Sequence, residues 1–75
     1  MFKYFMIKSN DSNQSTYGIE VLEYNNGNLI FVDEITNVSS DQEFVKRLVD
    51  DCNTYQLDPV HLRDVIEDRL FSANL

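Results

Sequence analysis

The sequence predicts an α+β fold in which a hairpin of two helices packs on one face of a three-stranded antiparallel sheet. Three observations support this prediction: β-rich segments fill the first half of the chain, an Asn-Gly pair separates two of them, and two amphipathic helical segments follow. The expected order is therefore β-β-β-α-α. A sheet that buries one face under a helix pair is an economical solution for a short chain, and we expect residues 1–75 to form a single small domain.

The predicted strands occupy residues 2–8, 16–24 and 29–35. Residues 2–8 are mostly aromatic and apolar, which favours a strand, and they are too few for a useful helix. Residues 9–15 are a run of polar turn formers, so we expect a mobile loop there. Asn26 and Gly27 both tolerate positive φ, and their position between two β-rich runs is typical of a hairpin turn.

A turn at Asn26 and Gly27 also predicts the register of this hairpin. The expected cross-strand pairs are Tyr24 with Leu29, Leu22 with Phe31, Val21 with Val32, and Glu20 with Asp33. The last pair places two carboxylates opposite each other, which is unfavourable. Three interpretations stay open: the two side chains splay into solvent, a bulge shifts the register, or the pair binds a cation.

The same register divides the hairpin into two faces that are both apolar near the turn. One face has Ile19, Val21, Ile30 and Val32, and the other has Leu22, Tyr24, Leu29 and Phe31. Because two helices cover only one face, the second face stays exposed unless the first strand, the helices or the loop also cover it. An exposed apolar face usually marks a partner or self-association site. The candidate interface is thus Leu22, Tyr24, Leu29 and Phe31, with Glu20 and Asp33 as acids that would steer a basic partner.

The first helix is predicted to begin at Ser40 and to end at about Tyr55. Ser40 and Glu43 have the spacing of a capping box, in which each residue bonds a free backbone N–H of the first turn. The residues with the spacing of one apolar helix face are Phe44, Val45, Leu48, Val49, Cys52 and Tyr55. We therefore expect this helix to pack on the sheet.

The last helix is predicted over residues 58–70. Asp58 is a suitable N-cap, and Pro59 already has a helical φ and lacks the N–H that would go unsatisfied. Leu57 and Leu62 have the spacing of a hydrophobic staple. One face of this helix is apolar and consists of Leu62, Val65, Ile66 and Leu70. The short connection between the helices predicts that they are neighbours.

Composition excludes several classes of function. Six basic against thirteen acidic residues give a net charge of −7, which disfavours direct binding to nucleic acid or to an anionic membrane. A single cysteine cannot form an internal disulfide, so we expect a reducing compartment. The first residues lack the apolar run of a signal peptide, and no segment is long enough to span a membrane. The predicted location is the cytoplasm.

Few residues suggest catalysis or metal binding. His61 lies in the first turn of a predicted helix, which favours a packing or hydrogen-bonding role over that of a base. Cys52 lies on an apolar helix face, where a thiol is inert. Asp64, Glu67 and Asp68 form a candidate acidic surface without the loop of a calcium site. Phosphate-loop, nucleophile-elbow and zinc motifs are absent from the sequence, so we expect no enzyme, cofactor or metal.

One segment also carries a family likeness. Residues 57–68, together with Cys52-Asn53 and Tyr17-Gly18-Ile19, resemble a family of short uncharacterised proteins from Firmicutes, chiefly clostridia, classed as a domain of unknown function. The likeness is most specific in the run P-x-H-L-x-D-x-x-E-D and spans most of the chain. The resemblance implies a bacterial cytosolic protein. It implies no activity and no functional residues.

Three hypotheses of function follow. The leading one is a small acidic cytosolic module that acts by contact with another protein, or with a second copy of itself, in an interaction or regulatory role. The second is an acidic nucleic-acid mimic that occupies the basic groove of a DNA-binding protein, suggested by the net charge of −7. The third is a minimal metal-binding or enzymatic domain built on His61, Cys52 and nearby acids.

Overall fold

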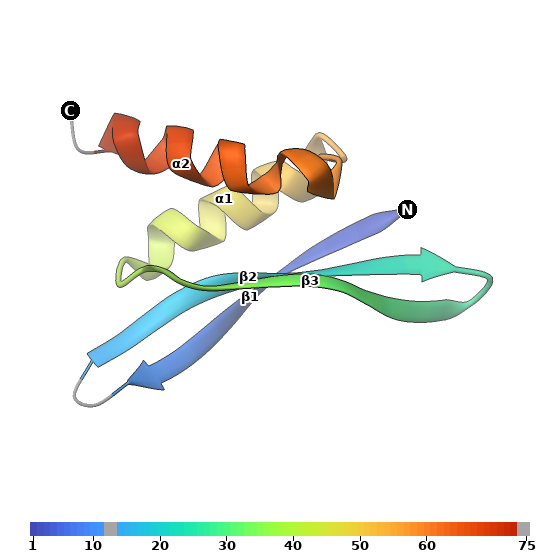
Figure 1. The fold of residues 1–75 in the computed structure, drawn as a ribbon, viewed down its shortest axis with the longest axis horizontal. Coiled ribbons are helices and arrows are strands. Elements are labelled where there is room, and N and C mark those ends of the chain that lie inside the picture. The colour runs from blue at the N-terminus through green and yellow to red at the C-terminus, as the bar shows by residue number, and fades with distance from the viewer. Residues whose placement is uncertain (12–13, 74–75) are drawn as a thin grey trace.

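Three antiparallel strands and two helices make up the computed structural model, which describes residues 1–11 and 14–73. The elements are β1 (Phe2–Asp11), β2 (Gln14–Asn25), β3 (Asn28–Ser39), α1 (Gln42–Thr54), the 3₁₀ helix η1 (Pro59–His61) and α2 (Leu62–Ala73). The strand order in the sheet is β1-β2-β3, and both helices lie on the same side of it (Figure 1). The predicted α+β class, element order and helix placement are therefore confirmed.

The β2–β3 hairpin turns at Asn26 and Gly27, as predicted. Their φ angles of 52° and 82° are those of a type I′ turn, whose twist matches that of the strands it joins. The two predicted pairs nearest the turn, Tyr24 with Leu29 and Leu22 with Phe31, are confirmed.

Beyond these pairs the predicted register is wrong, because the ladder contains a β-bulge. Val21 pairs with Asp33 rather than with Val32, and Glu20 pairs with Glu34 rather than with Asp33. Val32 is thus an extra residue on β3, and no local feature of the sequence predicts this bulge. Of the three interpretations of the acidic pair, the bulge is the one found. The shift exchanges one acidic pair for another, since Glu20 and Glu34 are now opposite each other.

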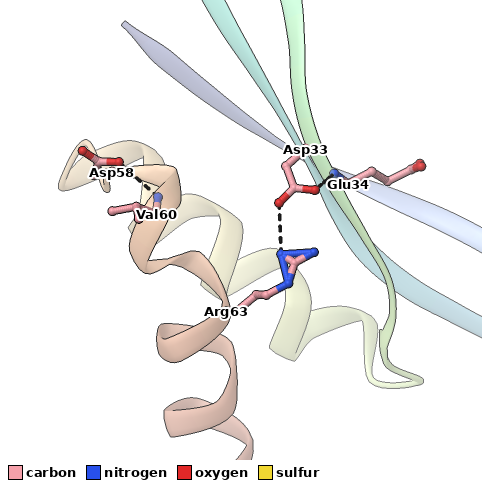
Figure 2. A network of polar contacts seen from close by, with 5 residues as sticks. All are labelled: Asp33, Glu34, Asp58, Val60 and Arg63. Atoms are coloured by element: carbon pink, nitrogen blue, oxygen red, sulfur yellow. Dashed lines mark hydrogen bonds and ion pairs between the residues drawn. The ribbon is translucent and has the colours of Figure 1, made fainter.

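The bulge places Asp33 on the side of the sheet that faces the helices. There its Oδ2 atom accepts a hydrogen bond from Nη1 of Arg63 on α2, at 3.0 Å (Figure 2). Its second oxygen, Oδ1, accepts from the backbone N–H of Glu34 at 2.8 Å. Asp33 therefore joins β3 to α2.

A second irregularity lies between Tyr17 and Ile19 of β2, where the backbone of β3 approaches Gly18 closely. A Cβ atom on Gly18 would lie 2.2 Å from the carbonyl oxygen of Ile35, so any other residue would force the strands apart. Past this point β3 does not end at residue 35 but continues to Ser39, with Asn37 at a φ of 56°.

The predicted loop at residues 9–15 is largely strand. Ser9 pairs with Thr16, and Asn10 pairs with Ser15, so the β1–β2 ladder extends into the polar segment from both sides. Residues 12–13 of the predicted loop lie outside the described residues. Pairing with a neighbouring strand overrides the low β-propensity of these residues.

Helix α1 begins one residue later than expected. Its N-cap is Asp41, whose Oδ1 atom accepts from the backbone N–H of Phe44 at 3.2 Å, and not Ser40. Because the third residue after this cap is Phe44 rather than a glutamate, the predicted capping box with Glu43 does not form. The backbone N–H of Asp41 donates to the hydroxyl of Ser39 at 3.0 Å, which fixes the chain before the helix.

Helix α1 ends at Thr54, and the chain reverses at Gln56, whose φ is 51°. The backbone N–H of Leu57 bonds the carbonyl of Cys52 at 3.0 Å, which is the geometry of a Schellman motif. Tyr55 therefore lies outside the helix and is 79% exposed, so its predicted place on the apolar face is wrong.

The start predicted for the last helix is confirmed at Asp58, whose carboxylate accepts from the backbone N–H of Val60 at 3.0 Å (Figure 2). The first turn is the 3₁₀ helix η1, and α2 follows and continues past Leu70 to Ala73. The core lies between the helix pair and the sheet. Its buried members are Tyr4, Ile19, Val21, Val45, Leu48, Val49, Cys52, Leu62 and Ile66. Within the described residues no helix is long and apolar enough to cross a membrane.

Candidate functional site

The face of the sheet turned away from the helices is the candidate functional site. Ile19 and Val21 point into the core, so by the alternation of a strand Glu20, Leu22 and Tyr24 point to the opposite side, together with their cross-strand neighbours. We call this surface the outer face. It consists of Lys3, Phe5 and Ile7 of β1, Glu20, Leu22 and Tyr24 of β2, and Leu29, Phe31 and Glu34 of β3.

The outer face exposes large apolar side chains on all three strands. Phe31 is 59% exposed, Leu29 53%, Tyr24 48% and Phe5 42%, and Leu22 between them is half-buried. Neither helix reaches this side of the sheet (Figure 1). β1 lies beside β2 and widens the face, instead of folding over it as one interpretation of the sequence allowed.

The charges of the outer face lie next to its apolar centre. Lys3 is the cross-strand neighbour of Leu22, and Phe5 is the neighbour of Glu20, which in turn is opposite Glu34. The salt bridges among the described residues join Arg63 to Asp33 and Arg69 to Asp51, so neither glutamate takes part in one. An acidic pair without a partner cation thus borders the exposed apolar surface.

The structure brings together five of the six predicted interface residues and separates the sixth. Glu20 lies on the outer face with the four predicted apolar residues, but Asp33 lies on the helix side, because the bulge shifts it by one position. Glu34 takes the place predicted for Asp33. Phe5 was not among the predicted interface residues, because the register that places β1 beside Leu22 and Glu20 has no local signal in the sequence.

The tip of the hairpin is exposed on its other side as well. Ile30 is 48% exposed and Val32 is 38% exposed, although both were predicted on the apolar face with Ile19 and Val21. The hairpin projects past the ends of both helices, which therefore do not cover this end (Figure 1).

The predicted acidic surface lies on α2. Asp64, Glu67 and Asp68 are all exposed, and within the described part of the chain no group of three potential metal ligands occurs. Nearby, Nη2 of Arg69 donates to Oδ2 of Asp51 at 2.8 Å. This surface is a solvated helix side, separate from the outer face.

The free edge of β1 is bound by a side chain of α1. The carboxamide of Asn53 accepts from the backbone N–H of Tyr4 at 2.8 Å and donates to its carbonyl at 2.9 Å, as a neighbouring strand would. The hydroxyl of Tyr4 donates to the carbonyl of Leu57 at 2.5 Å. Burial raises the pKa of Tyr4 to about 12, with smaller contributions from Cys52 and Asp58, so the phenol remains a donor.

Cys52 and His61 lie in different environments. Cys52 is only 3% exposed, and burial raises the pKa of its thiol even though the nearby Arg69 acts in the opposite direction. A small hollow of about 190 Å³ beside it is lined mainly by apolar side chains, among them Leu48, Leu57 and Val65. His61 is exposed at the end of η1. The burial of Cys52 therefore stabilises its thiol form, which is a poor nucleophile.

Comparison with known proteins gives a family and no activity. No curated protein and no solved structure matches the chain. Residues 1–72 match the family of unknown function DUF6514, which agrees with the predicted resemblance to a domain of unknown function over most of the chain. Because this match covers nearly the whole chain, the protein belongs to the family of unknown function DUF6514.

Proposed function

We propose that the protein is a small protein–protein interaction module that binds its partner through the outer face. The observation that supports this most is the exposure of Phe5, Tyr24, Leu29 and Phe31 on one side of the sheet, at 42–59% each. Small soluble domains seldom leave a continuous patch of this kind uncovered unless it is an interface. Aromatic side chains in the middle of such a patch supply most of the binding energy of an interface.

The charges of the outer face favour a partner with a basic group beside an apolar surface. Glu20 and Glu34 repel each other across the ladder, and a lysine or arginine of the partner would relieve that repulsion. The net charge of −7 would also speed the approach of a basic partner. Binding of this kind weakens as salt is added, because salt screens the charges.

The proposal places the protein in the bacterial cytoplasm and gives it no catalytic role. A buried cysteine with a raised pKa and an exposed histidine, on different elements, are a weak basis for an enzyme. The acidic surface of Asp64, Glu67 and Asp68 supports a second candidate, a nucleic-acid mimic that binds a DNA-binding protein. That candidate would use α2 instead of the outer face.

A capture experiment with matched variants tests the proposal. The immobilised wild-type chain, the Phe5→Ala variant and the Val60→Ala variant are exposed to the same bacterial lysate, and the retained proteins are quantified by mass spectrometry. Val60 is a suitable control, because it is 75% exposed on η1, away from the sheet. We expect Phe5→Ala to lower the retention of the specific partner by about tenfold or more, as for an interface anchor.

Two results would count against this proposal. If Phe5→Ala retains the same proteins as the wild type, the outer face is not the binding surface. If binding is instead lost in an Asp64→Asn, Asp68→Asn variant, the acidic surface of α2 is the site and the nucleic-acid mimic is favoured. Circular dichroism of each variant confirms that the fold is intact.

A further inference from the structure

We propose that the free edge of β3 pairs with β3 of a second copy of the chain, so that two sheets join into one continuous antiparallel sheet. This inference goes beyond the proposed function, because it concerns the backbone edge of the hairpin rather than the outer face. The dimer would leave the outer face of both copies open to a partner.

β3 presents backbone groups that are available for pairing. It is an edge strand, and Asn25 and Asn28 form the first pair beside its two-residue turn. Such a pair exchanges hydrogen bonds across the hairpin, so by alternation Leu29 and Phe31 direct their N–H and C=O groups away from β2. Among the described residues, no backbone bond outside the sheet ladders involves Leu29 or Phe31.

The side chains along this edge are apolar on both sides. Leu29, Ile30, Phe31 and Val32 are exposed by 53%, 48%, 59% and 38%, and the run contains neither proline nor lysine. Soluble proteins usually protect an edge strand with proline or lysine, because an unprotected apolar edge pairs with other chains. The hairpin end projects past the helices, so neither helix obstructs a second strand (Figure 1).

The opposite edge of the sheet is blocked. The carboxamide of Asn53 already bonds both backbone groups of Tyr4 near the start of β1, where an added strand would otherwise pair. The exposed apolar run of residues 29–32 therefore makes β3 the better edge for pairing, and a symmetric pairing there closes at two copies instead of continuing into a fibre.

The charges of β3 select the register of the dimer. A two-fold axis at Ile30 places Leu29 opposite Phe31 of the partner subunit, and these residues have the outward backbone groups that exchange bonds. Asp33 and Glu34 then lie near the neutral turn of the second copy. An axis at Asp33 would instead place the Asp33 carboxylates of the two copies directly opposite each other, which is unfavourable. Because each copy has a net charge of −7, we expect added salt to strengthen the dimer.

Backbone substitution tests this pairing. The solution mass of the wild type, Leu29→Pro and Leu29→Ala is measured by light scattering over a concentration series at low and high salt. Proline removes the outward N–H but is tolerated where that group does not bond β2, whereas alanine removes only the side chain. We expect a wild-type dimer that strengthens with salt, a smaller effect of Leu29→Ala, and at least about a tenfold loss of affinity in Leu29→Pro.

A second variant keeps the test valid if Leu29→Pro does not fold. In the proposed dimer Ile30 lies opposite Ile30 of the partner subunit, in a pair without backbone hydrogen bonds between its members. The Ile30→Cys variant therefore brings one thiol from each copy to a separation compatible with a disulfide. We expect mild oxidation to link Ile30→Cys into a covalent dimer, and to leave the wild type unlinked because Cys52 is buried. Val60→Cys, with an exposed thiol far from β3, is the control.

The proposal is overturned by a wild-type chain that stays monomeric at every concentration and salt level. It is also overturned if the dimer persists in Leu29→Pro but dissociates in Phe5→Ala, since the outer face would then hold the copies together. Lysate binding that depends on Phe5 while the chain is monomeric would support the proposed function and reject the pairing, so the two failures are distinguishable.

Discussion

At the scale of single residues, Tyr4 and Asn53 fasten β1 to the helix pair. The phenol of Tyr4 bonds the carbonyl of Leu57, and the carboxamide of Asn53 bonds the backbone of Tyr4. These contacts could not be predicted from the sequence, because each joins residues about fifty positions apart. They depend on where α1 packs on the sheet, and no local sequence pattern predicts that position.

Replacement of Tyr4 by phenylalanine tests the first of these contacts. We expect Tyr4→Phe to lower the free energy of unfolding by about 1–2 kcal/mol, because the carbonyl of Leu57 loses its donor. The measurement is urea denaturation followed by circular dichroism. Tyr55→Phe is the matched control, because Tyr55 is exposed, and an equal loss of stability there would contradict the prediction.

The same variant carries a prediction about pH. The pKa of Tyr4 is about 12 in the folded chain against an ordinary value of 10.0, so the unfolded chain loses this proton first as pH rises. The contribution of Tyr4 to stability is therefore complete below pH 10 and is lost between pH 10 and 12. Tyr4→Phe should reduce the alkaline decline in stability, and Tyr55→Phe should not.

At the scale of elements, the predicted features are those with local causes. The hairpin turn follows from two residues that tolerate positive φ, and the helix faces follow from apolar spacing. The bulge at Val32 could not be predicted, since an extra residue is defined only by the strand opposite it. Ser40 and Asp41 are both good caps by residue type, so local sequence does not decide between them, and the structure uses Asp41.

Two alanine variants decide which residue caps α1. We expect Asp41→Ala to lower the free energy of unfolding by about 0.5–2 kcal/mol, because the first turn loses the acceptor of the Phe44 N–H. Ser40→Ala should change it by less than about 0.5 kcal/mol, as is usual for an exposed residue without such a contact. Urea denaturation of both variants gives the comparison, and the reverse order would restore the cap at Ser40.

At the scale of the whole molecule, half of the candidate site follows from the hairpin alone. The alternation of β2 and β3 places Leu22, Tyr24, Leu29 and Phe31 on one side, and the structure keeps them there. The contribution of β1 could not be predicted, because its register depends on the pairing of polar residues 9–11 with residues 14–16. The part of the surface that β1 supplies thus depends on pairing in a segment that looks like a loop in sequence.

The charge of the whole chain leads to a prediction about salt. A net charge of −7 makes the folded state repel itself, and the two salt bridges among the described residues are both exposed and therefore weak. We expect the urea midpoint to rise with added sodium chloride at a fixed low protein concentration. The Asp68→Lys variant, with less excess negative charge, should respond less to salt. A midpoint that falls with salt would show that the ion pairs outweigh the repulsion.

Because Cys52 is buried, the rate at which its thiol is labelled measures how often the core opens. Cys52 has 3% of its surface exposed and lies beside a hollow lined by side chains of α1, α2 and the segment that joins them. The chain has no second thiol, so labelling by a thiol reagent reports on Cys52 alone, and we expect it to proceed when α2 moves away from α1. The labelling rate in native buffer therefore reports how often the core opens, with no denaturant and no engineered probe. Any ligand or second chain that holds the two helices together would lower this labelling rate.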